Sequence, residues 1–382
     1  MRAALTVAAT LALAARADAE PLRLRGDALA SAQSPVGLLV LGGDGGVAPG
    51  VSAEALVWMG TDADHGDALV MAVVARRADR RAEVRLGRLI ATAGALRPQH
   101  VDGVAGRARL PARFDVEAFG GVPVVPQLGV RAWDWLAGGR IGRRLGDWGG
   151  VGVAALERRS QGRLDVRELG VDAAVAYRKS DLAARAVLDA IDPTLADVDV
   201  AVTHRMGGLR VELAGQHRVA SHLLPATSLF TVLGDVASDR LGAAVRWKAA
   251  PRLDLAADVG ARAVDAEYAA DAYCRAVLRL DDAGKGAITG ELRRTGVVDG
   301  GWTGARLAVR VPRGAFTAAL EGELVVPDVD RGRGTMWPWG LAALGWTQGA
   351  WDAAMAVEAS STPADRYRVD VLAQLGRRWE VP

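Results

Sequence analysis

Residues 302–326 read WTGARLAVRVPRGAFTAALEGELVV, and this stretch decides the fold. Two runs of alternating residues flank the turn at 312–314. In each run, one phase is apolar or small, and the other carries Arg or Glu. Because successive side chains of a β-strand point to opposite faces, the pattern predicts an antiparallel hairpin of two strands of about ten residues. A hairpin with one apolar and one charged face is the repeating unit of a closed transmembrane β-barrel.

The same alternation recurs almost to the C-terminus. It is clearest in residues 169–177, 196–202, 253–261, 351–359 and 367–375. Short links, such as 178–180 and 312–314, alternate with longer ones, such as 218–239 and 327–336. That rhythm is typical of short periplasmic turns and longer external loops. We therefore predict an all-β fold: a single antiparallel transmembrane β-barrel of about 18 strands, with a range of about 16–20.

The N-terminal region differs from the rest. Residues 1–19 have the pattern of a signal peptide: Arg2, a short apolar core and the small-residue site Ala17-Asp18-Ala19. Residues 20–50 are rich in Gly and Ala without clear alternation, which predicts a periplasmic N-terminal lead-in. The barrel is expected over residues 51–382. No later apolar run approaches the roughly 20 residues of a transmembrane helix.

A soluble β-sandwich or propeller is the competing fold. Those folds also alternate, but their apolar face forms a core and is rich in large branched residues. Here the apolar phase is rich in Ala and interrupted by Gly, while the opposite phase is charged over long runs. This composition leaves no place for a second packed layer, so the barrel is the better interpretation.

Composition and motifs argue against several functions. The 47 basic and 45 acidic residues nearly cancel, which argues against a nucleic-acid partner. Cys274 is the only cysteine, and no HExxH, P-loop or GxSxG motif occurs. A hydrolase built from His204, His217 and His222 with a nearby serine is the enzymatic alternative, but it lacks a nucleophile motif. We therefore expect no enzyme, no catalytic residue, no metal site and no cofactor.

Several tryptophans fall at or near the ends of predicted strands. Indole rings prefer the boundary between membrane and water, so these residues are candidates for aromatic girdles. The candidates are Trp247, Trp302, Trp339, Trp346, Trp351 and Trp379.

The charged phase of the strands is where function is expected. Opposed charges there form either a structural network of cross-strand ion pairs or the lining of a water-filled lumen, and the two interpretations are compatible. The mixed signs argue against strong ion selectivity. The candidate lumen-lining residues are Arg85, Arg107, Arg109, Asp197, Asp199, Arg205, Arg210, Glu212, Asp254, Asp258, Arg262, Arg306, Arg310, Glu321 and Glu323.

The pattern resembles the outer-membrane β-barrels of Gram-negative bacteria, in particular the porin-like group. Locally, Arg85-Leu86-Gly87-Arg88, followed by Gly94 and Asp102-Gly103, is similar to a segment of several porin-like families. Trp379 resembles the terminal aromatic residue that the barrel-assembly machinery recognises, although Arg377 interrupts the apolar phase before it.

The resemblance implies an outer-membrane location, contact with lipid and lipopolysaccharide, and passive diffusion of small polar solutes. The alternative is a non-enzymatic barrel within an envelope assembly, such as a machine for surface-polysaccharide export. The sequence does not determine the oligomeric state.

Overall fold

The computed structural model describes residues 22–32, 37–60, 66–124, 134–219, 237–264, 267–296, 300–329, 336–361 and 367–381. Within these ranges the only helical element is a short 3-10 turn, η1 (Pro111–Arg113). The first strands are β1 (Leu22–Ser31), β2 (Leu38–Ala48), β3 (Val51–Gly60), β4 (Gly66–Arg76), β5 (Ala82–Ala91), β6 (Gln99–Arg109), β7 (Phe114–Pro123), β8 (Trp135–Arg144), β9 (Gly149–Ser160), β10 (Arg163–Tyr177) and β11 (Ser180–Asp189). The later strands are β12 (Thr194–Met206), β13 (Leu209–Arg218), β14 (Ser238–Ala250), β15 (Leu253–Val264), β16 (Glu267–Arg279), β17 (Ala287–Thr295), β18 (Trp302–Arg313), β19 (Phe316–Pro327), β20 (Trp337–Gln348), β21 (Trp351–Ser360) and β22 (Arg368–Val381).

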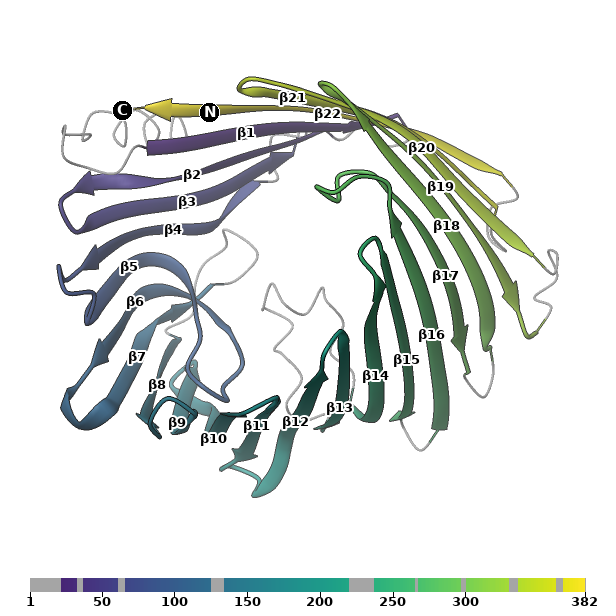
Figure 1. Cartoon of the computed structure of the whole chain (residues 1–382). Helices are drawn as coiled ribbons and strands as arrows, with labels where there is room; N and C mark the ends of the chain where they lie inside the picture. The colour runs from purple at the N-terminus through teal and green to yellow at the C-terminus, as the bar shows by residue number, and fades with distance from the viewer. Residues whose placement is uncertain are drawn as a thin grey trace.

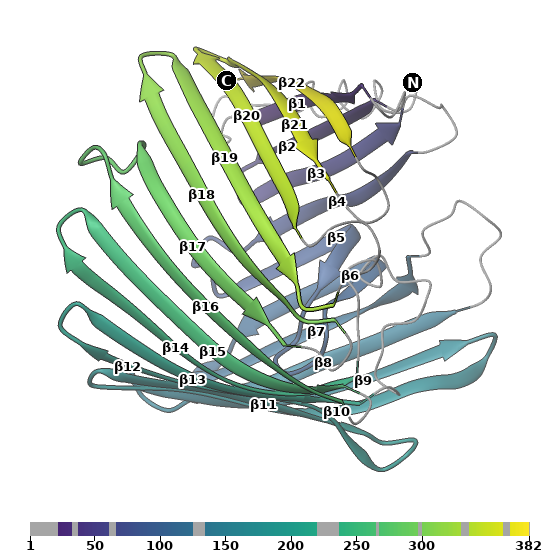
Figure 2. The same cartoon turned by 90° about the vertical axis from the view of Figure 1, so that its right-hand side faces the viewer.

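The strands close into one barrel. Each strand pairs antiparallel with its neighbours in sequence, and β1 also pairs with β22, where Leu24 lies opposite Trp379. Figure 1 shows the strands following one another around a ring with β1 beside β22, and Figure 2 shows their steep tilt. The prediction of a single antiparallel all-β barrel is confirmed.

The predicted number of strands is wrong, because the barrel has 22 strands rather than about 18. Two of the additional strands, β1 and β2, lie in residues 20–50, the segment expected to be a periplasmic lead-in. They pair with β22 and β3 and complete the wall. In β2, Leu38 and Val40 lie on the inner face and Leu39 and Leu41 on the outer face, so the alternation of polar and apolar residues is lost.

The two faces of the wall have opposite character. In the hairpin β18–β19, Leu307 is 57% exposed and Leu320 is 63% exposed, whereas Arg306 lies opposite Glu323 on the other face. Large exposed apolar side chains keep this phase around the barrel, including Val171, Leu241, Val259 and Met355. A closed sheet with its backbone fully paired and its outer face apolar is suited to hydrocarbon.

No helix in the described ranges has the length and hydropathy needed to cross a bilayer.

The two rims of the barrel differ. The short-turn rim holds the ends of β1 and β22 and two-residue turns such as 314–315 and 349–350. Gly314 (φ 60°) adopts the left-handed conformation that such a tight turn needs. A longer turn, 280–286, is held by Asp281, whose carboxylate accepts hydrogen bonds from the backbone N–H groups of Lys285 (3.0 Å) and Gly286 (2.6 Å). Hydrogen bonds from backbone N–H groups, that of Gly286 foremost, lower the pKa of Asp281. The long-loop rim holds the opposite ends of the strands.

Candidate functional site

Most of the charged residues of the strands lie on the inner face of the barrel. The strand register places all of the expected lumen-lining residues in the phase of Arg306 and Glu323, opposite the exposed apolar side chains. Most have an oppositely charged neighbour on the same face. Examples of these ion pairs are Arg107–Glu83 (3.0 Å), Arg205–Asp181 (2.5 Å), Arg210–Glu212 (2.8 Å), Arg262–Asp271 (3.6 Å) and Arg85–Glu54. Exposed ion pairs each add only about 0–1 kcal/mol, so their main effect is to orient the side chains of the wall.

Glu291 of β17 organises one sector of this wall. Its carboxylate accepts hydrogen bonds from the Tyr273 hydroxyl (2.9 Å) and the Arg293 guanidinium (2.5 Å). Arg306 lies at 3.5 Å and Arg275 at 3.6 Å from the same carboxylate, whose side chain is 8% exposed. Three guanidinium groups therefore share one carboxylate, and Glu321 and Glu323 balance the remaining charge.

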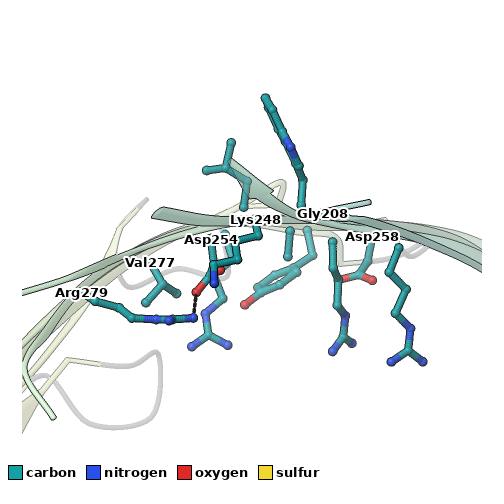
Figure 3. Close-up of a pocket in the computed structure, with 13 residues that line it drawn as sticks. Gly208, Lys248, Asp254, Asp258, Val277 and Arg279 are labelled. Atoms are coloured by element: carbon teal, nitrogen blue, oxygen red, sulfur yellow. Dashed lines mark hydrogen bonds and ion pairs between the residues drawn. The ribbon is translucent and has the colours of Figure 1, made fainter. Parts of the chain in front are cut away.

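On the inner faces of β13–β16, basic side chains outnumber acidic ones near the short-turn rim. A cavity of about 560 Å³ near the short-turn rim is lined there by Asp254 and Asp258 and by a basic patch. The basic patch consists of Arg210, Arg246, Lys248, Arg275 and Arg279. Asp254 and Arg279 form an ion pair (Figure 3). Arg246 and Lys248 have no ion-pair partner in the part of the chain that the structure describes.

The link between β5 and β6, residues 92–98, enters the barrel. We call it the inward segment; it is the blue loop that extends from β5 and β6 toward the interior in Figure 1. Ala93, Ala95 and Leu96 are at most 2% exposed. Ala93 and Leu96 pack with residues of the inner wall to form an apolar cluster that includes Leu89, Phe119, Leu136 and Leu156. Burying a leucine fully contributes about 1.5–3 kcal/mol, so the cluster holds the segment firmly.

Charged residues of β8, β10 and β12 hold the inward segment on the side away from β5 and β6. A Cβ placed on Gly94 (φ 55°) would lie 2.5 Å from Arg140 Cδ and 2.3 Å from Asp172 Oδ2, so only glycine fits there. Arg97 lies 3.8 Å from Asp197 of β12, a residue only 1% exposed. Asp197 was expected to line open lumen; the structure instead covers it, in ion pairs with Arg97, Arg185 and Arg218. The segment thus spans from β5–β6 to β12 and narrows the lumen.

The aromatic candidates divide between the two faces. Trp247, Trp346, Trp351 and Trp379 lie on the outer face at the short-turn rim. The expectation for the other two is wrong, because the register puts them on the inner face. Trp302 lies opposite Thr295 there and covers Gly304. Trp339 lies opposite Glu323 and donates a hydrogen bond from Nε1 to Glu358 at 2.8 Å. Sequence analysis missed Phe114, Tyr177 and Phe316, which extend the outer aromatic group.

The local motif that resembles porin-like families surrounds the inward segment. Arg85 and Arg88 precede it on β5, and Asp102 follows it on β6. Arg88 forms a bidentate ion pair with Asp102 (2.8 and 3.0 Å), which links β5 and β6 next to the inward segment. Gly94 is the one residue of the motif that lies within the inward segment. The apolar residues beside it resemble ordinary strand residues, so nothing in the sequence indicated that they enter the barrel.

The described residues contain no group of three or more His, Cys, Asp or Glu side chains placed to hold a metal ion.

No protein-family model and no curated protein sequence matches the chain. Among solved structures, it is similar to the E. coli P pilus tip assembly intermediate PapC-PapD-PapK-PapG, with a TM-score of 0.53, 9% identity, and coverage of 95% of this chain and 62% of that one. It is also similar to the usher PapC translocation pore (TM-score 0.50, 8% identity, 95% and 100% coverage). A weaker likeness is to Pseudomonas aeruginosa OccK1 (TM-score 0.42, 11% identity, 95% and 99% coverage).

At these identities the likeness shows the fold alone. It agrees with the closed antiparallel wall, the apolar outer face and the charged inner face described above. A closed wall of this kind has no exposed strand edge. Its outer face carries apolar side chains and its inner face carries charged ones. The chain therefore has the fold of a closed antiparallel β-barrel with an apolar outer face, similar to that of the usher PapC translocation pore.

Proposed function

We propose that the protein is a non-enzymatic channel through which small hydrophilic solutes diffuse passively across the outer membrane. The observation that carries this proposal is the charged inner wall, which the inward segment narrows from one side. With strands ~4.8 Å apart and tilted by about 40°, a ring of 22 strands is about 40–45 Å across. A ring of that width does not by itself select small solutes by size, and the inward segment occupies part of its interior.

The basic patch supports a weak preference for anions. Elsewhere on the inner wall the charges are mostly paired, which argues against strong selectivity. Arg246 and Lys248 have no acidic partner among the described residues and line a cavity on the inner wall. Unpaired cations at the mouth of a channel raise the local concentration of anions.

Planar-bilayer recording tests the channel and its preference together. We expect the purified protein to give stable open steps, and a KCl gradient to give a reversal potential that favours chloride slightly. The double variant Arg246→Gln, Lys248→Gln should move the reversal potential toward the potassium value. The matched control removes two charges from the outer face, Arg294→Gln with Arg313→Gln, and should leave the potential unchanged. A well-folded barrel that stays silent would contradict the channel.

The second candidate is a component of an envelope assembly, such as a polysaccharide exporter. The width of a 22-stranded ring favours it, because such a ring can admit cargo larger than small solutes. A silent barrel that conducts only after partner proteins are added would support this candidate. In either case we expect lipid and lipopolysaccharide around the barrel, insertion by the barrel-assembly machinery, and the short-turn rim in the periplasm.

A further inference from the structure

Three arginines at the short-turn rim stack on aromatic rings of the outer face. Arg143 lies 5.5 Å from the ring centre of Phe114, and Arg178 lies 5.1 Å from that of Tyr177. Arg377 contacts two rings, Trp351 at 4.7 Å and Trp379 at 5.2 Å. None of these arginines has a carboxylate partner within the described ranges of the chain.

The outer face of the long-loop rim is different, because its arginines are neutralised. Arg159 and Arg167 both contact Glu157, at 2.9 and 2.7 Å. Arg294 forms a bidentate ion pair with Asp328, with contacts of 2.5 and 2.7 Å. Among the described residues, the arginines of the outer face that lack an acidic partner lie at the short-turn rim.

Of the three arginines, Arg377 is the one that contacts two aromatic rings. It lies directly opposite Trp351 on β21 and Gly26 on β1. A Cβ on Gly26 would lie 3.3 Å from the Trp379 ring, so the missing side chain lets that ring lean over β1 toward the level of Arg377. The acidic residues nearby, Asp27 and Asp352, lie on the inner face and are separated from Arg377 by the sheet.

Arg377 lies at the short-turn end of the wall, where we expect the lipid headgroups to lie. Its partner Trp351 is the first residue of β21, directly after the turn 349–350. Tryptophan rings gather at this boundary between headgroups and hydrocarbon. Both rings lie within reach of a cation–π contact with the guanidinium, and Nε of Arg377 is buried without a hydrogen-bond partner. The planar N–H groups of a guanidinium match the oxygen atoms of a phosphate group.

We propose that Arg377, Trp351 and Trp379 form a binding site for the phosphate group of a glycerophospholipid in the membrane leaflet at the short-turn rim. The two rings hold the guanidinium at headgroup depth, and the lipid phosphate supplies the anion that no described carboxylate supplies. Arg143 with Phe114 and Arg178 with Tyr177 are single-ring sites of the same kind, placed along the same rim.

Native mass spectrometry of the folded protein in detergent, titrated with dimyristoyl phosphatidylglycerol, tests this site. We expect the wild-type protein to retain lipid at low concentration, and Arg377→Gln to weaken the tightest binding event by roughly tenfold, the loss of a charge-assisted bond. Arg378→Gln is the matched control, because it removes the same charge one residue away on the inner face, where Arg378 lies beside Asp352. Dimyristoylglycerol, which lacks the phosphate, should not be retained.

Several outcomes would overturn the site. They are equal binding by Arg377→Gln and the wild type, an equal loss in Arg378→Gln, and retention of dimyristoylglycerol as strongly as phosphatidylglycerol. If Arg377→Gln does not fold, Arg377→Lys keeps the charge without the planar fork and should bind lipid several-fold more weakly than the wild type. A variant that binds lipid normally but fails to insert in cells would assign these residues to recognition by the assembly machinery instead.

Discussion

At the scale of single residues, a shift of one position along a strand moves a side chain from one face of the wall to the other. Leu307 is 57% exposed on the outer face, while its neighbour Arg306 contacts Glu291 and Glu321 on the inner face. Alternation alone predicted this division, because no charged residue interrupts the apolar phase of β18 between Ala305 and Val311. Arg377 shows where alternation is insufficient. It lies in the outer phase, and only the positions of Trp351 and Trp379 explain a charge there.

The two faces should respond oppositely to charge. We expect Leu307→Arg or Val309→Arg to destabilise the folded barrel in lipid by about 2–4 kcal/mol if the position is near the midplane, and less near a rim. Arg306→Gln should cost no more than about 1 kcal/mol, because Glu291 keeps Arg293 and Tyr273 as partners. Folding efficiency in lipid vesicles checks all three variants. Equal damage from Arg306→Gln and Val309→Arg would show that the faces are misassigned.

At the scale of elements, hairpins with one apolar and one charged face were predictable and irregular ones were not. The hairpin of β18 and β19 lies where its alternation placed it. In β8, Gly138, Gly139 and Gly142 remove side chains from both phases, and only Arg140 and Arg144 carry charge on the inner face. The inward segment was also not predictable, because its burial depends on contacts with β7–β12 that no local pattern encodes.

Displacing the inward segment should open the lumen. Gly94→Val would place side-chain atoms against Arg140 and Asp172, so we expect the segment to move out of the barrel at the long-loop rim and single-channel conductance to rise. Gly162→Val is the matched control: Gly162 also has a positive φ (78°), but nothing lies within 4 Å of an added Cβ. Both variants carry about 1–2 kcal/mol of backbone strain, so only the clash differs. Unchanged conductance in a folded Gly94→Val barrel would show that the segment does not limit the pore.

At the scale of the whole molecule, the sequence predicted a closed barrel but not its size. The short-turn rim and the charged phase were visible without a structure. The seam of the barrel, where β1 and β2 complete the ring, was not, because Leu29, Leu38 and Val40 interrupt the charged phase of the inner face. Closure by β1 raises the strand number to 22, and the strand number sets the width of the ring.

Cysteine cross-linking across the seam tests this closure. In a Cys274→Ser background, Leu29→Cys with Gln374→Cys places two thiols directly opposite each other on the inner face of β1 and β22. Ala28→Cys with Leu375→Cys does the same on the outer face. Facing positions in a sheet have Cβ atoms about 4.5–5.5 Å apart, close enough for oxidation to join at least one pair after slight adjustment.

The control pair, Ala30→Cys with Gln374→Cys, is shifted by one residue and places its thiols on opposite faces, so it should stay reduced. The measurement is the mobility of the boiled, unreduced protein on a gel, since a bridge between the chain's two ends makes the unfolded chain more compact. If neither facing pair cross-links in a heat-modifiable, folded sample, residues 22–31 are not part of the wall, and the barrel has fewer than 22 strands.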